Sequence, residues 1–455
     1  MEMILEFLRD VLSQPALLIG IMSCVGLIAL KRPFHKIMTG TLKPILGYLM
    51  LAAGAGVIVS NLDPLGKMIE HGFHITGVVP NNEAIVAVAQ KVLGVETMSI
   101  LVVGLLMNLL IARFTKFKYV FLTGHHSLFM ACLMSAVLGT AGLSGIELIL
   151  VGGFLMGAWS AISPAIGQSY TSKVTDGDEI ALGHFGSLGY YLSAWVAKYV
   201  GKVEESTEDI EIPEKWGFLR DSTLSTALTM IVFYLIAAIA AGSEFVATLS
   251  GSMSPYLFAV MSAMNFAVGV AIVYSGVRMI LGDLIPAFQG IATKIIPNAI
   301  PAVDCAVFFT YAPTAVVLGF ISSFIGGIIG MLILGAVGGV LIIPGLVPHF
   351  FCGATAGIYG NATGGRRGAA VGAFLNGLAI TFLPALALPV LGQLGFQNTT
   401  FGDADFAVIG LVLGNAFEWI GMAGIYGVVV IAALVLIIPN FIKTKGKVIN
   451  YVEEE

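Results

Sequence analysis

Few ionisable side chains interrupt the apolar stretches of this chain, and three of them stand where a ligand could reach them. Asp304 follows Pro301 in PNAIPAVDCAVFFTYAP, and His125 and His184 each follow a glycine, which allows close approach of another group. An imidazole can donate and accept hydrogen bonds near neutral pH, and a carboxylate accepts them. We therefore expect these residues to bind a polyhydroxylated or weakly acidic solute, with proton transfer as an alternative for Asp304.

Each neighbouring polar residue also has a structural interpretation. Asp304 would cap the N-terminus of a half-helix, where the helix dipole favours negative charge. Glu83, in VVPNNEA, would lie in the first turn of a short helix and either cap it or contact the substrate beside Asn82. His126 fits a hydrogen bond between helices. The run TGGRRGA at 363–369 could hold a phosphate, but a cytoplasmic topology anchor is the favoured interpretation.

Signatures of enzyme catalysis are absent from the sequence. It has no phosphate-binding loop of the Walker type, no nucleophile elbow and no HExxH motif. Four cysteines lie in apolar surroundings without a CxxC pair, which predicts buried thiols rather than a disulfide or a zinc site; they are Cys24, Cys132, Cys305 and Cys352. We expect no catalytic residue, no metal ion, no cofactor and no enzyme activity of the chain on its own.

The composition assigns these residues to a membrane protein. Of the 455 residues 57% are hydrophobic and only 11% are charged, whereas soluble proteins carry about 25% charged residues. A mean hydropathy of +0.95 is too high for one water-soluble core. No basic domain suggests nucleic-acid binding. The sequence therefore predicts an all-α polytopic membrane protein.

A helix needs about 20 apolar residues to cross the hydrocarbon core. This criterion predicts about 11 transmembrane helices, near 11–30, 37–60, 97–113, 119–141, 144–163, 222–241, 256–280, 302–325, 327–347, 369–391 and 420–442. Four further apolar stretches are too short or too broken to span, and are expected to form re-entrant hairpins or interfacial segments; they are 80–94, 164–197, 349–361 and 403–418.

The basic residues predict the orientation. Their clusters fall on one side if the N-terminus is outside and the C-terminus is cytoplasmic. The acidic loop at Asp403 and Asp405 then lies outside. The polar loop 198–221 lies in the cytoplasm, provided that 180–197 does not cross. The clusters follow the first, third, seventh and last spans and precede the tenth.

A weak internal repeat is also present. The motif GTLKP at 40–44 resembles GDLIP at 282–286, and each is followed by a proline-containing break, at 78–84 and at 311–317. An odd number of spans in each half would make this an inverted repeat, a common transporter plan with the site between the halves.

Several motifs together give a family resemblance. They are LTGH at 122–125, VTDG followed by ALGH up to His184, AVDCAVFFTYAPTAVV at 302–317, IIPGLVPHFF at 342–351 and the GGRRGA run. With them the chain resembles the membrane-embedded IIC component of the ascorbate-type bacterial phosphotransferase systems. The resemblance extends from GTLKPILGYLMLAAG in the second span to the last helix.

The resemblance implies a homodimer in the bacterial cytoplasmic (inner) membrane. Each protomer would be one membrane-embedded unit, 1–455, with a core domain and a scaffold of V-motifs. It would import L-ascorbate, or a related sugar acid or polyol, while a separate cytoplasmic IIB protein, supplied by IIA, phosphorylates the solute. The substrate-binding residues that it implies are Asn82, Glu83, His125, Phe129, His184, Phe185 and Asp304.

Three positions depart from the ascorbate pattern. Phe129 and Phe185 stand where we expect glutamine, and Asn82-Glu83 replaces a Thr-Tyr pair. Aromatic faces can stack on a ring but do not replace the hydrogen bonds of an amide. The residues alone also fit a second class, a proton- or sodium-coupled secondary transporter of a small polar solute.

Overall fold

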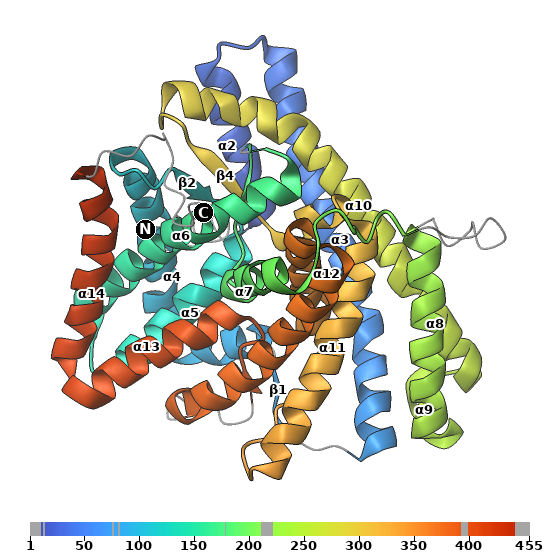
Figure 1. Cartoon of the computed structure of the whole chain (residues 1–455). Coiled ribbons are helices and arrows are strands. Elements are labelled where there is room, and N and C mark those ends of the chain that lie inside the picture. The colour runs from blue at the N-terminus through green and yellow to red at the C-terminus, as the bar shows by residue number, and fades with distance from the viewer. Residues whose placement is uncertain are drawn as a thin grey trace.

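The computed structural model describes Val11 and residues 14–74, 77–80, 82–177, 179–210, 222–392 and 399–441. Within these ranges seven helices are long and apolar enough to cross a membrane, or eight if the bent pair α8–α9 counts as one span. The chain is therefore a multi-pass helical membrane protein (Figure 1). Its helices are α2 (Pro15–Ala29), α3 (Phe34–Phe73), α4 (Asn82–Phe114), α5 (Gly124–Thr140), α6 (Gly145–Thr175), α7 (Ser187–Val200), α8 (Ser222–Ala241), α9 (Ser243–Ser250), α10 (Pro255–Lys294), α11 (Pro313–Ala336), α12 (Leu346–Gly392), α13 (Ala404–Ile420) and α14 (Met422–Ile437), with 3₁₀ turns η2 (Cys305–Thr310) and η3 (Ile438–Phe441).

Some predicted spans are divided differently in the structure. The stretch 119–141 holds a short strand and the 17-residue helix α5 rather than one continuous span. The stretches 302–325 and 327–347 share the single helix α11, which ends at Ala336 and leaves 337–345 irregular. The total of about 11 crossings remains a prediction.

Two 40-residue helices, α3 and α10, pack against each other over most of their length. Gly47 faces Gly276, and Gly54 faces Gly269 further along, so the two helices run antiparallel. A Cβ on Gly47 would lie 2.8 Å from the Gly276 carbonyl oxygen. Glycine is needed here because it lets the two backbones approach, which is how helices associate within a membrane.

Short strands lie between the helices and pair in two parallel sheets. Strand β4 lies between β2 and β3 in one sheet, and β1 pairs with β5 in the other. Each strand is followed within a few residues by a helix or a 3₁₀ turn, so the backbone changes from extended to helical at five places. Such non-helical backbone is tolerated at membrane depth only where protein surrounds it. The strands are β1 (Val79–Pro80), β2 (Tyr119–Phe121), β3 (Ala181–Leu182), β4 (Ile300–Val303) and β5 (Thr399–Thr400).

The long helix α12 is folded back on itself. Gly364 and Gly365 have non-helical backbone angles, and Gly365 has a φ of 59°. A Cβ on Gly360 would collide with the carbonyl of Gly368, so the segments before and after the break lie side by side. The Arg366 guanidinium after the turn lies 3.6 Å from the Glu205 carboxylate. One of the two arginines of the GGRRGA run thus faces an acidic side chain.

The length of helix α7 is relevant to the prediction that the loop 198–221 is cytoplasmic. It has 14 residues and a length of about 21 Å, which is shorter than the roughly 30 Å hydrocarbon core. It therefore cannot span by itself. The following residues 201–210 are held at α11, because the Glu208 carboxylate accepts hydrogen bonds from the backbone N–H groups of Thr314 and Ala315.

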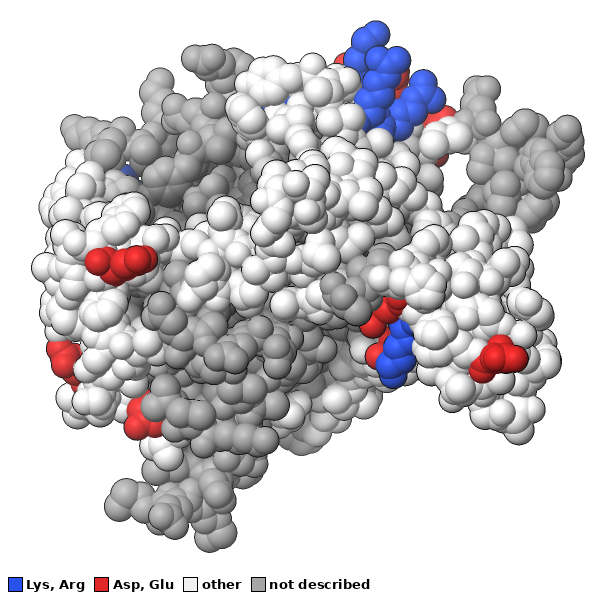
Figure 2. Space-filling view, turned by 90° about the horizontal axis from the view of Figure 1, so that it is seen from below, with Lys and Arg blue, Asp and Glu red and all other residues white. Residues whose placement is uncertain are grey.

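Charge is unevenly distributed over the molecule. The turn between α2 and α3 lies at the top of Figure 1, and the C-terminal end of α3 lies at the bottom. Figure 2 shows the face seen from below, where acidic side chains are scattered and Lys and Arg are few apart from a group near one edge.

Candidate functional site

The three-stranded sheet brings three predicted ligand residues to one edge. Phe121 at the end of β2 is in register with Ala302 of β4, and Leu182 at the end of β3 is in register with Val303. Because the strands are parallel, their carboxyl ends meet at the same edge. The residues that follow these ends are His125, His184 and Asp304.

Distances show how closely these side chains gather. His125 Nε2 lies 3.5 Å from Asp304 Oδ2, and Tyr48 Oη of α3 lies 3.2 Å from His125 Nδ1. The potential ligand atoms of His184, Asp304 and Cys305 lie within 4.8 Å of one another. The structure thus brings together His125, His184 and Asp304, which are up to 179 positions apart, and their role in binding remains a prediction.

These side chains line a cavity of about 970 Å³. The C-terminal half of α3 forms one wall and contributes Ser60, Asp63, Lys67 and Glu70. Lys67 is paired with Asp63 at 2.7 Å, so its charge is balanced locally. The opposite end is the cluster of strand ends, and its lining residues include Tyr48, Asn82, His125, His126, Phe129, His184, Asp304, Cys305, Cys352 and Asp403.

Two buried histidines are held as hydrogen-bond donors. The Phe185 backbone N–H donates to His126 Nδ1 at 3.3 Å, and the Gly186 N–H donates to His184 Nδ1 at 3.1 Å. Tyr190 Oη also lies 2.9 Å from His184 Nδ1. Because Nδ1 accepts in each neutral ring, the hydrogen is on Nε2. Each ring therefore has one N–H, on Nε2, that remains available as a donor.

The two-stranded sheet brings a second group to the cavity. Strands β1 and β5 are parallel, so the start of α4 at Asn82 meets the start of α13 at Asp403. Asn82 Nδ2 donates to Asp403 Oδ2 at 2.6 Å, and Asn82 Oδ1 accepts the Gly402 N–H at 2.9 Å. Cys352 Sγ donates to Asp403 Oδ1 at 2.9 Å.

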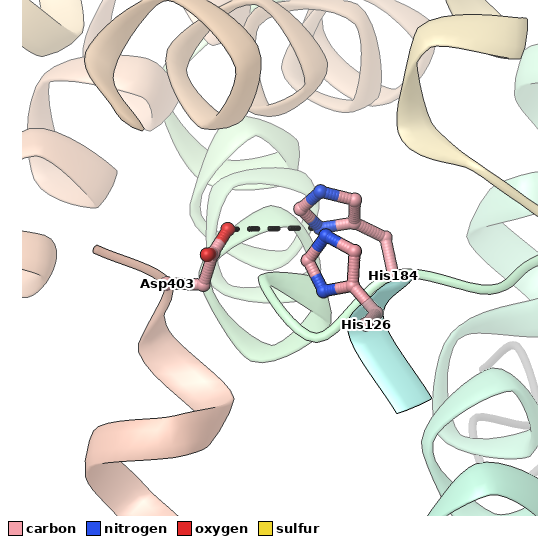
Figure 3. A group of neighbouring side chains, drawn as sticks. All are labelled: His126, His184 and Asp403. Atoms are coloured by element: carbon pink, nitrogen blue, oxygen red, sulfur yellow. Dashed lines mark ion pairs between the residues drawn. The ribbon is translucent and has the colours of Figure 1, made fainter. Parts of the chain in front are cut away.

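This second group adjoins the first. His184 Nδ1 lies 3.8 Å from Asp403 Oδ1, and the rings of His126 and His184 are 3.8 Å apart between centroids (Figure 3). His126, His184 and Asp403 could in principle hold a metal ion, since their ligand atoms lie within 4.8 Å of one another. Both Nδ1 lone pairs already accept backbone N–H groups, however, so the arrangement favours a ligand with hydroxyl groups.

The remaining predicted site residues have different positions. Phe129 lines the cavity, with its ring centroid 5.8 Å from that of His125. Phe185 does not line it: its side chain is fully buried and stacks on Phe121 at 4.6 Å. Glu83 lies in the first turn of α4, but its side chain is outside the described residues.

The alternative structural roles can also be examined. Asp304 occupies the N-cap of η2, but its carboxylate makes no capping hydrogen bond. His126 makes no hydrogen bond to another helix among the described contacts; its ring instead accepts the N–H of Phe185, which precedes α7. His126 nevertheless lines the cavity as well. The described cysteines are free thiols, and Cys305 and Cys352 face the cavity.

Asp403 and Asp405 do not form an exposed acidic loop, and the side of the membrane on which they lie remains a prediction. Their side chains are buried, at 5% and 0% exposed, because β5 turns inward to pair with β1. A pattern in the sequence marks Asp403 as a residue similar in position to His184. Asp403 follows Phe401-Gly402 just as His184 follows Leu182-Gly183, so the same pattern of apolar residue, glycine and ionisable residue marks both sites.

Comparison with known proteins shows the family of this chain. The family described as PTS system sugar-specific permease component (EIIC-GAT) matches residues 10–405. The chain is also 26% identical over 417 residues to a Mycoplasma pneumoniae protein named ascorbate-specific PTS system EIIC component. That alignment covers 78% of this chain and 62% of the relative, so the chain spans less than two thirds of the relative's length.

Proposed function

The chain belongs to the family of sugar-specific permease components of the phosphotransferase system, and we propose that it imports a sugar acid or polyol, foremost L-ascorbate. One observation carries this proposal. Imidazole donors and carboxylate acceptors line one cavity together, at His126, His184, Asp304 and Asp403. A polyhydroxylated ligand offers both acceptors and donors to such a set.

The helix starts add an electrostatic reason for a sugar acid. Helices α4, α5, α7 and α13 all begin within a few residues of the strand ends that form the site. A helix N-terminus carries partial positive charge and unpaired N–H groups, which favour an anion. These N-termini offset the negative charge of Asp304 and Asp403. An anionic sugar acid such as ascorbate is therefore compatible with two carboxylates in the site.

Phosphorylation is assigned to other proteins in this proposal. The chain has no phosphate-binding loop, and its described residues hold no soluble phosphocarrier domain. A separate cytoplasmic IIB protein, charged by IIA, would phosphorylate the solute as it leaves the site. The chain is then a translocating subunit and not an enzyme by itself.

The proposed setting is the bacterial inner membrane, with the N-terminus outside and the C-terminus cytoplasmic. The basic turn between α2 and α3 would face the cytoplasm by the positive-inside rule. The C-terminal half of α3, which lines the cavity, would then face outward, as would the face seen in Figure 2. The polar loop 198–221 would be a cytoplasmic part of the single unit 1–455.

We also propose an inverted repeat, in a register that differs from the one expected from the motifs. Helices α3 and α10 begin and end 221 residues apart, and so do Pro80 and Pro301 in the strands that follow. Pro44 and Pro286 occupy opposite ends of those helices, so they are not equivalent. In this register the hairpin of α5 and α6 corresponds to the folded-back α12, and both serve as re-entrant hairpins of a core. In this proposal helices α3 and α10 form part of the V-motif scaffold. The protein itself would be a homodimer.

The test uses the purified chain in proteoliposomes. We expect slow exchange of labelled L-ascorbate and no uphill accumulation under an imposed proton or sodium gradient. Addition of the cognate IIA and IIB proteins with a phosphate donor should convert transported solute to its phosphorylated form. Concentrative uptake of unmodified solute by the chain alone would overturn the proposal and establish the secondary-transporter alternative.

A further inference from the structure

Asp403 and Asp405 are separated by one residue and differ in what their carboxylates contact. Asp405 is fully buried and accepts hydrogen bonds from Trp159 Nε1, Ser187 Oγ and the Leu188 N–H. It ties α13 to α6 and α7 and does not line the cavity. Asp403 is also buried but does line the cavity. The first carboxylate is therefore a structural anchor, and the second faces the ligand space.

The hydrogen bonds of Asp403 leave room for a ligand. A carboxylate offers about four acceptor positions. Among the described residues, Asn82 and Cys352 each supply one donor, and the Cys352 thiol is a weak donor. His184 Nδ1 supplies none, because it accepts the Gly186 N–H and stands 3.8 Å away. A buried carboxylate with unused acceptor positions gains from a further donor.

The position of Asp403 complements that of Asp304. Potential ligand atoms of both carboxylates lie within 4.8 Å of His184, and each belongs to a different three-residue group around it. Both acidic residues thus lie close to the same imidazole. A ligand with several hydroxyl groups could contact both carboxylates and the His184 Nε2–H at once.

We propose that Asp403 binds the substrate directly, as the acceptor for a hydroxyl group of the ligand beside His184. Asn82 in turn positions Asp403, since its amide already joins the carboxylate to the Gly402 N–H. This inference rests on the proposed function, and it assigns Asn82 to positioning rather than to substrate contact.

The test exchanges the two side chains. In the double variant Asn82→Asp/Asp403→Asn, the hydrogen bond and the total charge are retained, but the carboxylate moves from α13 to α4. Binding of L-ascorbate and of a panel of polyols is measured by calorimetry on the purified full-length chain. Asp403→Asn and the double variant should both bind on the order of 10- to 100-fold more weakly than the wild type, as expected for loss of a charged hydrogen-bond partner.

A second arm identifies the hydroxyl group. Each single-deoxy analogue of the ligand is titrated into the wild type and into Asp403→Asn. For the analogue that lacks the contacted hydroxyl, the two proteins should bind equally, because the group that distinguishes them has no partner. Asp405→Asn is the matched control, which should lower the melting temperature and leave the affinity of the folded protein unchanged.

The outcomes separate the two proposals. Recovery of wild-type affinity in the double variant would show that Asp403 only holds α4 against α13, and would overturn the assignment alone. A constant loss for every deoxy analogue would overturn it as well. A wild-type chain that binds neither L-ascorbate nor any polyol would overturn the proposed function and this assignment with it. If Asp403→Asn does not fold, the double variant carries the comparison, because it restores the hydrogen bond.

Discussion

At the scale of single residues, the three histidines of the cavity are held to different degrees. His184 is 5% exposed at its side chain and is fixed by a backbone N–H and by Tyr190, whereas His125 is 37% exposed and contacts Tyr48 and Asp304. A hydrogen bond in a buried site is stronger than one near water. The side chain of His184 is therefore held more rigidly in position for ligand binding than that of His125.

This difference predicts the order of binding defects. His125→Ala, His184→Ala and Asp304→Asn should each weaken ligand binding by about 1–3 kcal/mol, with the largest loss at His184. Titration of ligand into the purified variants measures the effect, and size-exclusion chromatography checks that the protein remains intact. His126→Ala cannot serve as the control, because His126 contacts His184 and lines the cavity. The exposed His35 is the better control, and a loss at His35→Ala would refute the site.

A second prediction concerns the two phenylalanines that replace glutamine. Phe129→Gln should change ligand affinity with little loss of stability, because the ring lines the cavity. Phe185→Gln should instead destabilise the fold by about 1–3 kcal/mol, because it buries an amide among Phe121 and Phe406 without a partner. Thermal melts and titrations on both variants measure this. Equal melting temperatures would contradict the assignment of Phe185 to the core.

The sequence could identify those cavity residues that carry an obvious chemical signal. Asp304, His125 and His184 stood out as ionisable groups in apolar surroundings. Tyr48 did not, because one tyrosine among many on a long apolar helix carries no mark of the contact that it makes across the fold. Asp403 was missed because its neighbour Asp405 made the pair resemble an exposed acidic loop.

At the scale of elements, the site depends on strands of two to four residues. Segments this short have no usable periodicity, and their pairing partners lie far away in the sequence: β2 pairs with β4 after an interval of almost 180 residues. Hydropathy could locate the long apolar helices but not their ends, since α3 continues to Phe73 whereas the predicted span stops at 60, and it could not give the strand register. Contacts between distant segments therefore determine which predicted spans contain a strand before their helix.

The turn inside α12 gives a prediction at this scale. Gly365 has a positive φ, and a Cβ there would collide with the carbonyl oxygens of Lys202 and Glu205. Gly365→Ala should destabilise the protein by about 1–3 kcal/mol, because both the backbone conformation and the close approach exclude a side chain. The melting temperature in detergent measures the effect. Gly427→Ala in α14, where a Cβ meets nothing within 4 Å, is the matched control and should be neutral or slightly stabilising.

At the scale of the whole molecule, the orientation can be tested with single cysteines. Ser60→Cys, in the cavity wall formed by α3, should react quickly with an impermeant thiol reagent in intact cells. Cysteines at Glu205 or in the tail at Lys445 should stay unlabelled until the cells are opened, because both are expected in the cytoplasm. The parent protein gives the background from Cys305 and Cys352, which also line the cavity. Rapid labelling at Glu205 in intact cells would show that 180–197 crosses the membrane.

The parallel pairing of β2 with β4 has a consequence for how the protein is made. Almost 180 residues separate β2 from β4 in the sequence, so β2 leaves the ribosome before its partner has been synthesised. Its backbone N–H and C=O groups, and the polar start of α5 with His125 and His126, would be costly to expose to lipid. The insertion machinery must therefore hold this segment away from the bilayer until β4 arrives. The architecture of the binding site thus sets the order of assembly, since the first half can close only after the second half has been translated.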